Sequence, residues 1–166
     1  MYEATTGTLE AATGGTITYA QPNGAGNGVG ATLTTTGSFT LIDTANVQTA
    51  GTRILVKNEA NTVYNGVYTW ATGGTVLTRS TDTDSYGPGT GDLSENDYFF
   101  VQNGTVNKGN AYVCTTSGTI TFGTTAITFS QFSTSQVYTG TSPINVSGTV
   151  ISLNTVPVTS GGTGLT

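Results

Sequence analysis

Five of the chain's nine acidic side chains gather in residues 82–97, which read DTDSYGPGTGDLSEND. Two carboxyl groups at a fixed separation suffice for glycoside hydrolysis, because one protonates the leaving oxygen while the other acts as base or nucleophile. Carboxylates can also join backbone carbonyls around calcium, although this stretch lacks the spacing of an EF-hand loop. Aspartate among Gly, Pro and Ser more often caps turns. We therefore predict no catalytic residue and no metal site in this stretch. Two of its acidic residues, Asp82 and Asp84, are kept as candidate ligand contacts. The five acidic residues are Asp82, Asp84, Asp92, Glu95 and Asp97.

Aromatic side chains in or beside loops form a second set of candidates, because their faces stack on sugar rings and on protein partners. Tyr86 lies within the same Gly/Pro-rich stretch and is the better exposed candidate. Trp70 ends an apolar run, where a buried core position is the favoured interpretation. Both residues are kept as candidate ligand contacts.

Other catalytic chemistry has little support in the sequence. The chain has no His, which excludes Ser-His-Asp and Cys-His arrangements and His-based zinc sites. Cys114 is the single cysteine, so an internal disulfide is excluded, and its place in AYVCTT favours a packed thiol. The run GAGNGVG (24–30) resembles a dinucleotide fingerprint only in its Gly spacing and is predicted to be an exposed, flexible loop. No cofactor is predicted.

The charge of the chain restricts its partners. Charged residues make up 8%, with four Lys and Arg and a net charge of −5. Such a chain has no basic patch for nucleic acid or for an anionic membrane surface. No apolar run is long enough to span a bilayer, and MYEATTGTLEAATGG lacks the regions of a signal peptide. We therefore predict no nucleic acid partner, no membrane insertion and no signal peptide.

Short apolar runs bounded by Gly, Asn and Pro recur along the chain, and none shows sustained helical spacing. Residues 42–52 are the one helix-like possibility. Thr-rich strands with Gly and Asn turns predict an all-β fold, an antiparallel sandwich or a barrel-like domain. The expected strands lie in GATLTTTGSFTLID, RILVKN, NGVYTWAT, TVLTRS, DYFFVQNGT, AYVCTT, TITFGT and AITFSQF.

Residues 53–70, RILVKNEANTVYNGVYTW, predict two strands joined across the loop from Asn58 to Gly66. Alternation places Arg53, Leu55 and Lys57 on one face, with Ile54 and Val56 on the other. Nothing in the sequence would perturb the pKa of Lys57 for acid–base chemistry. Arg53 and Lys57 are therefore predicted to pair with nearby acids.

A second hairpin is predicted around a turn at Ser117–Gly118. This register pairs Thr115 with Ile120 and Val113 with Phe122. Val113, Ile120 and Phe122 would then share one core-facing side.

The predicted domains are an N-terminal connector (1–27), a β-rich domain (28–135) and a C-terminal segment with a Gly-rich hinge (136–166). The C-terminal segment contains a hairpin, SPINVSGTVISLN, with a turn at Ser147–Gly148 that pairs Val146 with Thr149 and Ile144 with Ile151. Four aliphatic side chains cannot bury themselves within an isolated hairpin. Self-association around a threefold axis is the favoured hypothesis, and packing on the preceding domain is the alternative. The predicted trimer contacts are Ile144, Val146, Ile151 and Leu153.

Residues 28–132 resemble a domain that recurs in bacteriophage tail fibres and related virion-fibre proteins. The resemblance lies in the order GATLTTTGSFTLID, RILVKNEANTVYNGVYTW, TVLTRSTDTD, GDLSENDYFFVQNGTVNKGNAYVCTT and AITFSQF. TGTSPINVSGTVISL is similar to units of trimeric fibre shafts, and VPVTSGGTGLT to the connector that precedes a further shaft or knob module, as if the chain were a piece of a longer fibre.

The resemblance implies a non-enzymatic, homotrimeric component of a virion tail fibre that contacts other fibre proteins. It also implies that the module spaces or presents surfaces for attachment to a host-cell glycan. Three alternatives stay open: a polysaccharide depolymerase that uses the carboxylates of residues 82–97, a bacterial fibre adhesin of phage origin, and a spacer without a ligand of its own.

Overall fold

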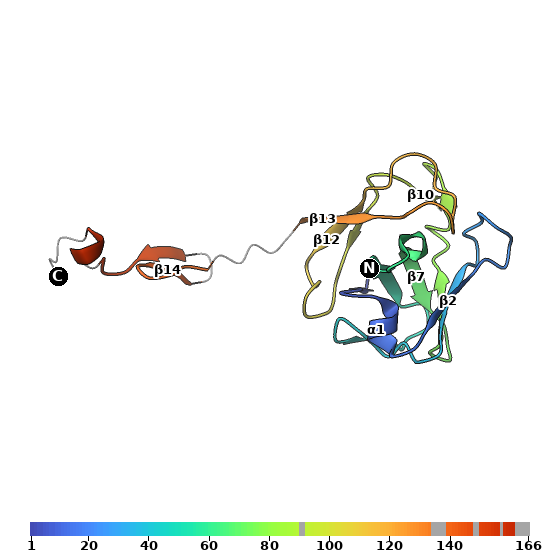
Figure 1. Cartoon of the computed structure of the whole chain (residues 1–166), viewed down its shortest axis with the longest axis horizontal. Helices are drawn as coiled ribbons and strands as arrows, with labels where there is room; N and C mark the ends of the chain where they lie inside the picture. The colour runs from blue at the N-terminus through green and yellow to red at the C-terminus, as the bar shows by residue number, and fades with distance from the viewer. Residues whose placement is uncertain (90–91, 134–138, 148–149, 157, 162–166) are drawn as a thin grey trace. The chain divides into compact units, whose positions relative to one another are not determined.

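An open six-stranded sheet forms the centre of the larger of the chain's two units (Figure 1). The computed structural model describes residues 1–89, 92–133, 139–147, 150–156 and 158–161. The chain divides into Met1–Thr134 and Ser135–Thr166. The strand order is β1 (Glu3–Ala4), β6 (Arg53–Val56), β7 (Gly66–Trp70), β8 (Val76–Arg79), β3 (Thr32–Thr35) and β2 (Ile17–Ala20); β1 runs parallel to β6 and the other neighbours are antiparallel.

Smaller elements complete this unit. An antiparallel three-stranded sheet has the order β11, β12, β13, and a helix and a 3₁₀ turn lie between strands. Two short pairs are the antiparallel β4–β5 and the parallel β9–β10. The bounds are α1 Leu9–Thr13, β4 Leu41–Ile42, β5 Ala45–Asn46, η1 Thr62–Tyr64, β9 Ser85–Tyr86, β10 Asp92–Leu93, β11 Tyr98–Phe100, β12 Ala111–Cys114 and β13 Phe129–Ser133.

The six-stranded sheet is buried on both faces, and β6 shows why. Leu55 packs into a cluster that also contains Phe99 and Tyr112 of the three-stranded sheet. Its neighbours Ile54 and Val56 point the other way, into a cluster with Leu9 of α1 and with Phe39, Ile42 and Val47. The expected alternation along β6 is therefore correct, and both of its faces are core. The prediction of an all-β fold is confirmed, and none of the described sheets closes into a barrel.

One prediction about the first half of the chain was wrong. Residues 1–27 are part of the larger unit and not a connector, because β1 pairs with β6 and β2 pairs with β3. The short helix also lies here, where Thr8 caps its start and Gly14, with φ of 69°, ends it. Residues 42–52, the one helix-like possibility in the sequence, carry the end of β4, the strand β5 and turns.

The predicted Ser117–Gly118 hairpin does not form. β12 pairs with β13, so that Cys114 lies opposite Phe129, and Thr115 N donates to Thr128 O at 2.9 Å. Residues 116–127 form a long loop between β12 and β13, and the expected strand TITFGT (119–124) does not form. Ile120 and Phe122 instead anchor this loop in the core, because both side chains are almost fully buried.

The unit Ser135–Thr166 contains the predicted C-terminal hairpin, β14 (Ile144–Ser147) with β15 (Val150–Leu153), and a 3₁₀ turn η2 (Val158–Ser160). The register differs from the prediction, because Ile144 lies opposite Leu153 and Val146 opposite Ile151. This register pairs aliphatic side chains with each other instead of pairing Val146 with Thr149. The predicted turn residue Gly148 and Thr149 lie outside the described residues.

Candidate functional site

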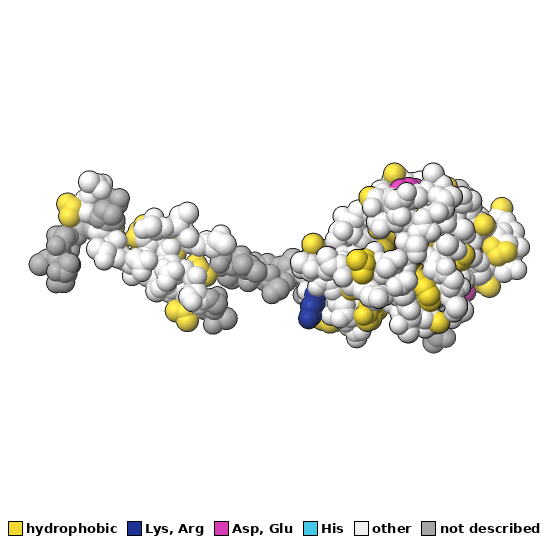
Figure 2. Space-filling view, turned by 90° about the horizontal axis from the view of Figure 1, so that it is seen from below, with side chains coloured by type: hydrophobic (Ala, Val, Ile, Leu, Met, Phe, Trp, Pro, Cys, Tyr) yellow, Lys and Arg dark blue, Asp and Glu magenta, His cyan; other side chains and the backbone are white. Residues whose placement is uncertain are grey.

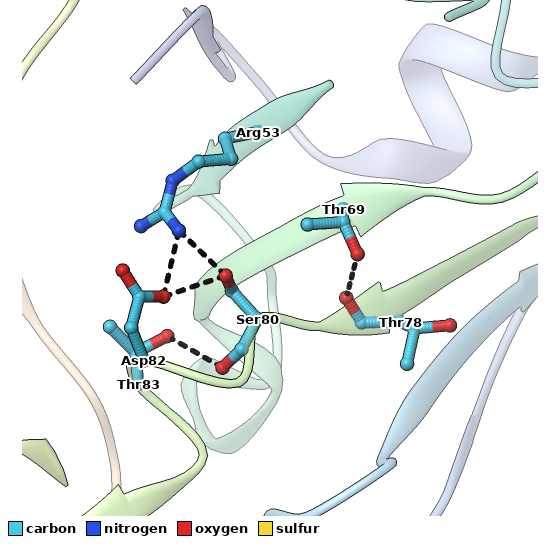
Figure 3. A network of polar contacts seen from close by, with 6 residues as sticks. All are labelled: Arg53, Thr69, Thr78, Ser80, Asp82 and Thr83. Carbon is cyan, nitrogen blue, oxygen red and sulfur yellow. Dashed lines mark hydrogen bonds and ion pairs between the residues drawn. The ribbon is translucent and has the colours of Figure 1, made fainter. Parts of the chain in front are cut away.

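The Asp82 carboxylate is held in a polar network with Arg53, the first residue of β6, and Ser80, which follows the end of β8 (Figure 3). Arg53 Nη1 donates to Asp82 Oδ1 at 2.8 Å and to Ser80 Oγ at 2.8 Å, and Ser80 Oγ donates to the same carboxylate oxygen at 2.7 Å. Burial would raise the pKa of Asp82, but the hydrogen bonds and charge of Arg53 together with Ser80 lower it below its ordinary value. The predicted pairing of Arg53 with an acid is confirmed, and the acid is Asp82.

Lys57 does not form the predicted ion pair. Arg53–Asp82 is the one salt bridge within the described part of the chain. Lys57 Nζ instead donates to Asn58 Oδ1 at 2.9 Å and lies 4.6 Å from the centre of the Tyr112 ring. Burial lowers the pKa of Lys57, while the charge of Asp43 raises it. The amide and the ring take the place of a carboxylate partner.

Two other acids of the 82–97 stretch hold turns. Asp92 Oδ2 accepts from Gly89 N at 2.7 Å, and Asp97 Oδ2 accepts from Ser94 N at 2.8 Å. Both line a hollow of about 210 Å³ together with Asp82. No group of three or more His, Cys, Asp or Glu side chains in the described ranges could hold a metal ion. These carboxylates serve local structure, as turn-forming aspartates commonly do.

Asp84 and Tyr86 line a different hollow from Asp82. They border an open groove of about 400 Å³, which we call the Tyr86 groove; it is lined by residues 25–28, residues 84–86, Ile120 and Phe122. Asp84 is 7% exposed and Tyr86 is 42% exposed. The structure therefore separates the Asp82–Asp84 pair and brings Asp84 together with Tyr86.

The opposite wall of the Tyr86 groove comes from the GAGNGVG run, which was expected to be only an exposed loop. Gln21 Nε2 donates to Asn27 O and to Phe122 O, each at 2.9 Å, and so ties this run to the 116–127 loop. Gly26 and Phe122 also form an isolated β-bridge. At buried Gly28 a side chain would collide with the Asp84 carbonyl oxygen and the Phe122 ring. Glycine at position 28 is therefore required for this wall.

Arg79 supports the groove from behind, and nothing in its sequence context indicated this role. Its guanidinium carbon lies 4.7 Å from the ring centres of both Tyr68 and Phe122. The side chain is 1% exposed, and its Nη2 donates to Tyr68 Oη at 2.7 Å and to Asn65 O at 3.2 Å. The Arg79–Phe122 contact holds one wall of the groove on the core.

Trp70 and Cys114 are core residues. Trp70 is 9% exposed and its Nε1 donates to Phe39 O at 2.9 Å. This burial removes Trp70 from the candidate ligand contacts and confirms the core interpretation. The Cys114 thiol is fully buried, and burial raises its pKa, as expected for a packed thiol.

The C-terminal hairpin presents the predicted aliphatic face. Ile144 and Leu153 form one cross-strand pair and Val146 and Ile151 the next, so all four share a side. Ile151 is 64% exposed, Leu153 67% and Ile144 48%. Val150, opposite Ser147, adds an exposed aliphatic side chain to the other face. Figure 2 shows hydrophobic side chains at the surface of this unit.

Charge is sparse on the visible surface, and the side of the molecule seen in Figure 2 is mostly uncharged. Hydroxyl pairs replace ion pairs between segments, as at Thr13–Thr35, Thr44–Thr105 and Thr115–Thr128, with oxygen–oxygen distances of 2.7–2.9 Å. Within the part of the chain that the structure describes, no helix is both long and apolar enough to cross a membrane.

In comparisons with known proteins, no family model matches the chain, and no curated protein and no solved structure gives a significant match. A function for this chain is therefore inferred from its own residues and geometry and from the sequence resemblance.

Proposed function

We propose that this chain is a non-catalytic module of a bacteriophage tail fibre, which self-associates as a homotrimer and serves attachment of the virion to its host cell. The observation that carries the proposal is the exposed aliphatic face of the β14–β15 hairpin. A two-stranded hairpin is marginal alone in water, and aliphatic side chains as exposed as Ile144, Ile151 and Leu153 gain stability when they are covered.

Two further features support this function. The ordered motifs of residues 28–132 resemble a tail-fibre domain, and the hairpin sequence is similar to trimeric shaft units. Three of the five acids that a depolymerase could use are engaged in local structure, since Asp82 pairs with Arg53 while Asp92 and Asp97 hold turns. A bacterial fibre adhesin of phage origin would share the same architecture, and other fibre proteins are the natural neighbours of such a module.

The test is the mass of the full chain in solution, measured by light scattering and by sedimentation equilibrium. We expect about three times the 16.9 kDa of one chain. Ile151→Asn should yield monomers. Each chain then loses the burial of one aliphatic side chain, which contributes about 2 kcal/mol, and a trimer loses this contribution three times. Ser152→Asn introduces the same side chain on the opposite face of β15 and should leave the trimer intact.

A monomeric wild-type chain with the hairpin packed on residues 1–134 would overturn the proposal. Equal loss of association in the Ile151 and Ser152 variants would also contradict it, because the contact would then not be the aliphatic face.

A further inference from the structure

The Tyr86 groove combines a buried carboxylate with an exposed aromatic ring, and we propose that it binds a neutral hexopyranose of a surface glycan. In this assignment Tyr86 stacks on the sugar ring and Asp84 accepts hydrogen bonds from sugar hydroxyls. The proposal deepens the attachment function proposed above and rests on it only for the biological source of the glycan.

Asp84 supplies unused hydrogen-bonding capacity. Although the residue is 7% exposed, its only hydrogen bond within the described residues comes from Ser85 Oγ to Oδ1, at a long 3.3 Å. No described residue donates to its Oδ2, which is not among the fully buried atoms that lack a partner and is therefore within reach of solvent. Since Asp84 lines the groove, donors from a ligand can reach it there. Adjacent hydroxyls of a sugar match the two oxygens of a carboxylate.

Tyr86 supplies the stacking surface. It extends from β9, is 42% exposed, and its ring has no aromatic partner among the described residues. The C–H groups on one face of a pyranose are apolar and pack on the negative face of an aromatic ring. Ring and carboxylate together would orient the sugar, as a few polar groups do in apolar binding sites.

The charges around the groove favour a neutral ligand. Its lining contains no Lys or Arg, and the Asp84 carboxylate disfavours acidic sugars. Arg79, the nearby cation, is buried behind Phe122 and does not line the groove. Asn27 adds an amide whose Nδ2 makes only a 3.4 Å bond to Asn23 O, which leaves a donor for a sugar oxygen.

The walls of the groove are organised without a ligand. Gln21 bridges Asn27 and Phe122, and the Gly28 backbone packs directly on Asp84 and Phe122. Such pre-organisation lowers the entropic cost of binding a small, weakly bound sugar.

The experiment is an NMR titration of the ¹⁵N-labelled full chain with methyl α-glucoside, methyl β-galactoside, maltose and lactose at millimolar concentrations. At least one sugar should shift amide signals confined to residues 25–28, 84–86 and 120–122.

Tyr86→Ala should weaken binding roughly two- to tenfold, which corresponds to the stacking energy of one ring. Tyr86→Phe should retain binding, and Tyr98→Ala, at an exposed tyrosine outside the groove, should leave it unchanged. Asp84→Asn should weaken it as well, with thermal unfolding as a check on folding.

The assignment is wrong if no sugar of the panel shifts these residues, or if Tyr86→Ala binds like the wild type. If a trilysine peptide shifts the same signals and no sugar does, the ligand of the groove is a basic partner and not a glycan. The mass measurement separates the two proposals: a trimer without sugar binding removes the groove assignment alone, and a sugar-binding monomer removes the trimer alone.

Discussion

The Glu3 carboxyl at the start of β1 is fully buried. Its Oε1 accepts from Ala4 N at 3.1 Å, whereas Oε2 has no partner among the described residues. Burial and the Asp43 carboxylate raise the pKa of Glu3 to about 7, against the lowering effect of the Ala4 hydrogen bond. Glu3 therefore holds a proton in the folded chain at pH values where the unfolded chain has lost it.

Stability should consequently fall as the pH rises from about 4.5 to about 7. In this window the folded state binds the Glu3 proton and the unfolded state does not, so the free energy of unfolding decreases with pH. Glu3→Gln should flatten this dependence and be the more stable protein above pH 7, by about 2–3 kcal/mol. Urea unfolding at a series of pH values measures the effect.

The difference between Glu3→Gln and the wild type isolates the contribution of Glu3 to this pH dependence. The chain has no His, so no imidazole titrates in this window. Among the described residues, Glu59 is the one other carboxyl group with a raised pKa, caused first by burial, and it acts in the same direction. Glu95→Gln serves as the control, because it changes an exposed acid that is not among the causes of the raised pKa of Glu3 or of Glu59. An unchanged slope in Glu3→Gln would show that Glu3 is already ionised in the folded state.

At the level of elements, the start of β7 depends on a contact between a glycine and a buried cation. A Cβ at Gly66 would collide with Arg79 Nη1, and the φ of Gly66 is 147°. Arg79 cannot move away easily, since it is stacked between two rings and bonded to Tyr68 Oη. The glycine at position 66 therefore lets the Arg79 guanidinium approach the backbone at the start of β7.

Gly66→Ala should accordingly destabilise the protein by roughly 1–3 kcal/mol more than Gly73→Ala. Gly73 also has a positive φ, of 112°, but nothing lies within 4 Å of the place that a Cβ would take there. Backbone strain of about 1 kcal/mol is common to both variants, so their difference isolates the Arg79 contact. Chemical denaturation gives both values.

Introducing Arg79→Ala should remove most of the extra cost at position 66, because the colliding group is then gone. Equal losses in the two glycine variants would mean that the guanidinium yields freely.

For the whole molecule, the hydrophobic core and the exposed aliphatic hairpin face belong to different units. Both buried clusters lie within Met1–Thr134, whereas the aliphatic residues of the hairpin in Ser135–Thr166 are largely exposed. The first unit has its own core, and the second has little to bury within itself.

A chain that ends at Thr134 should therefore fold, stay monomeric and keep the thermal midpoint of the larger unit. The reason is that none of its core residues comes from the removed segment. Calorimetry of the truncated and full chains, at concentrations where the full chain has dissociated, compares the midpoints without the contribution of association. A clear loss of stability in the truncated chain would show that the second unit stabilises the first.

The local pattern of residues determined the all-β fold, the β6–β7 hairpin and the aliphatic face of the C-terminal hairpin. These features depend on neighbours two residues apart or on one turn, so alternation and turn residues are enough to predict them. The error in the register of the C-terminal hairpin did not change its face, because a shift of two residues preserves alternation.

Only the tertiary structure decided the place of residues 1–27, the partner of β12 and the composition of the Tyr86 groove. β1 pairs with a strand about fifty positions away, and the groove joins residues 25–28, 84–86 and 120–122. The burial of Arg79, Glu3 and Asp84 likewise follows from segments that meet only in the folded chain. Long-range pairing and burial have no local sequence signal, since they depend on how the whole core is filled.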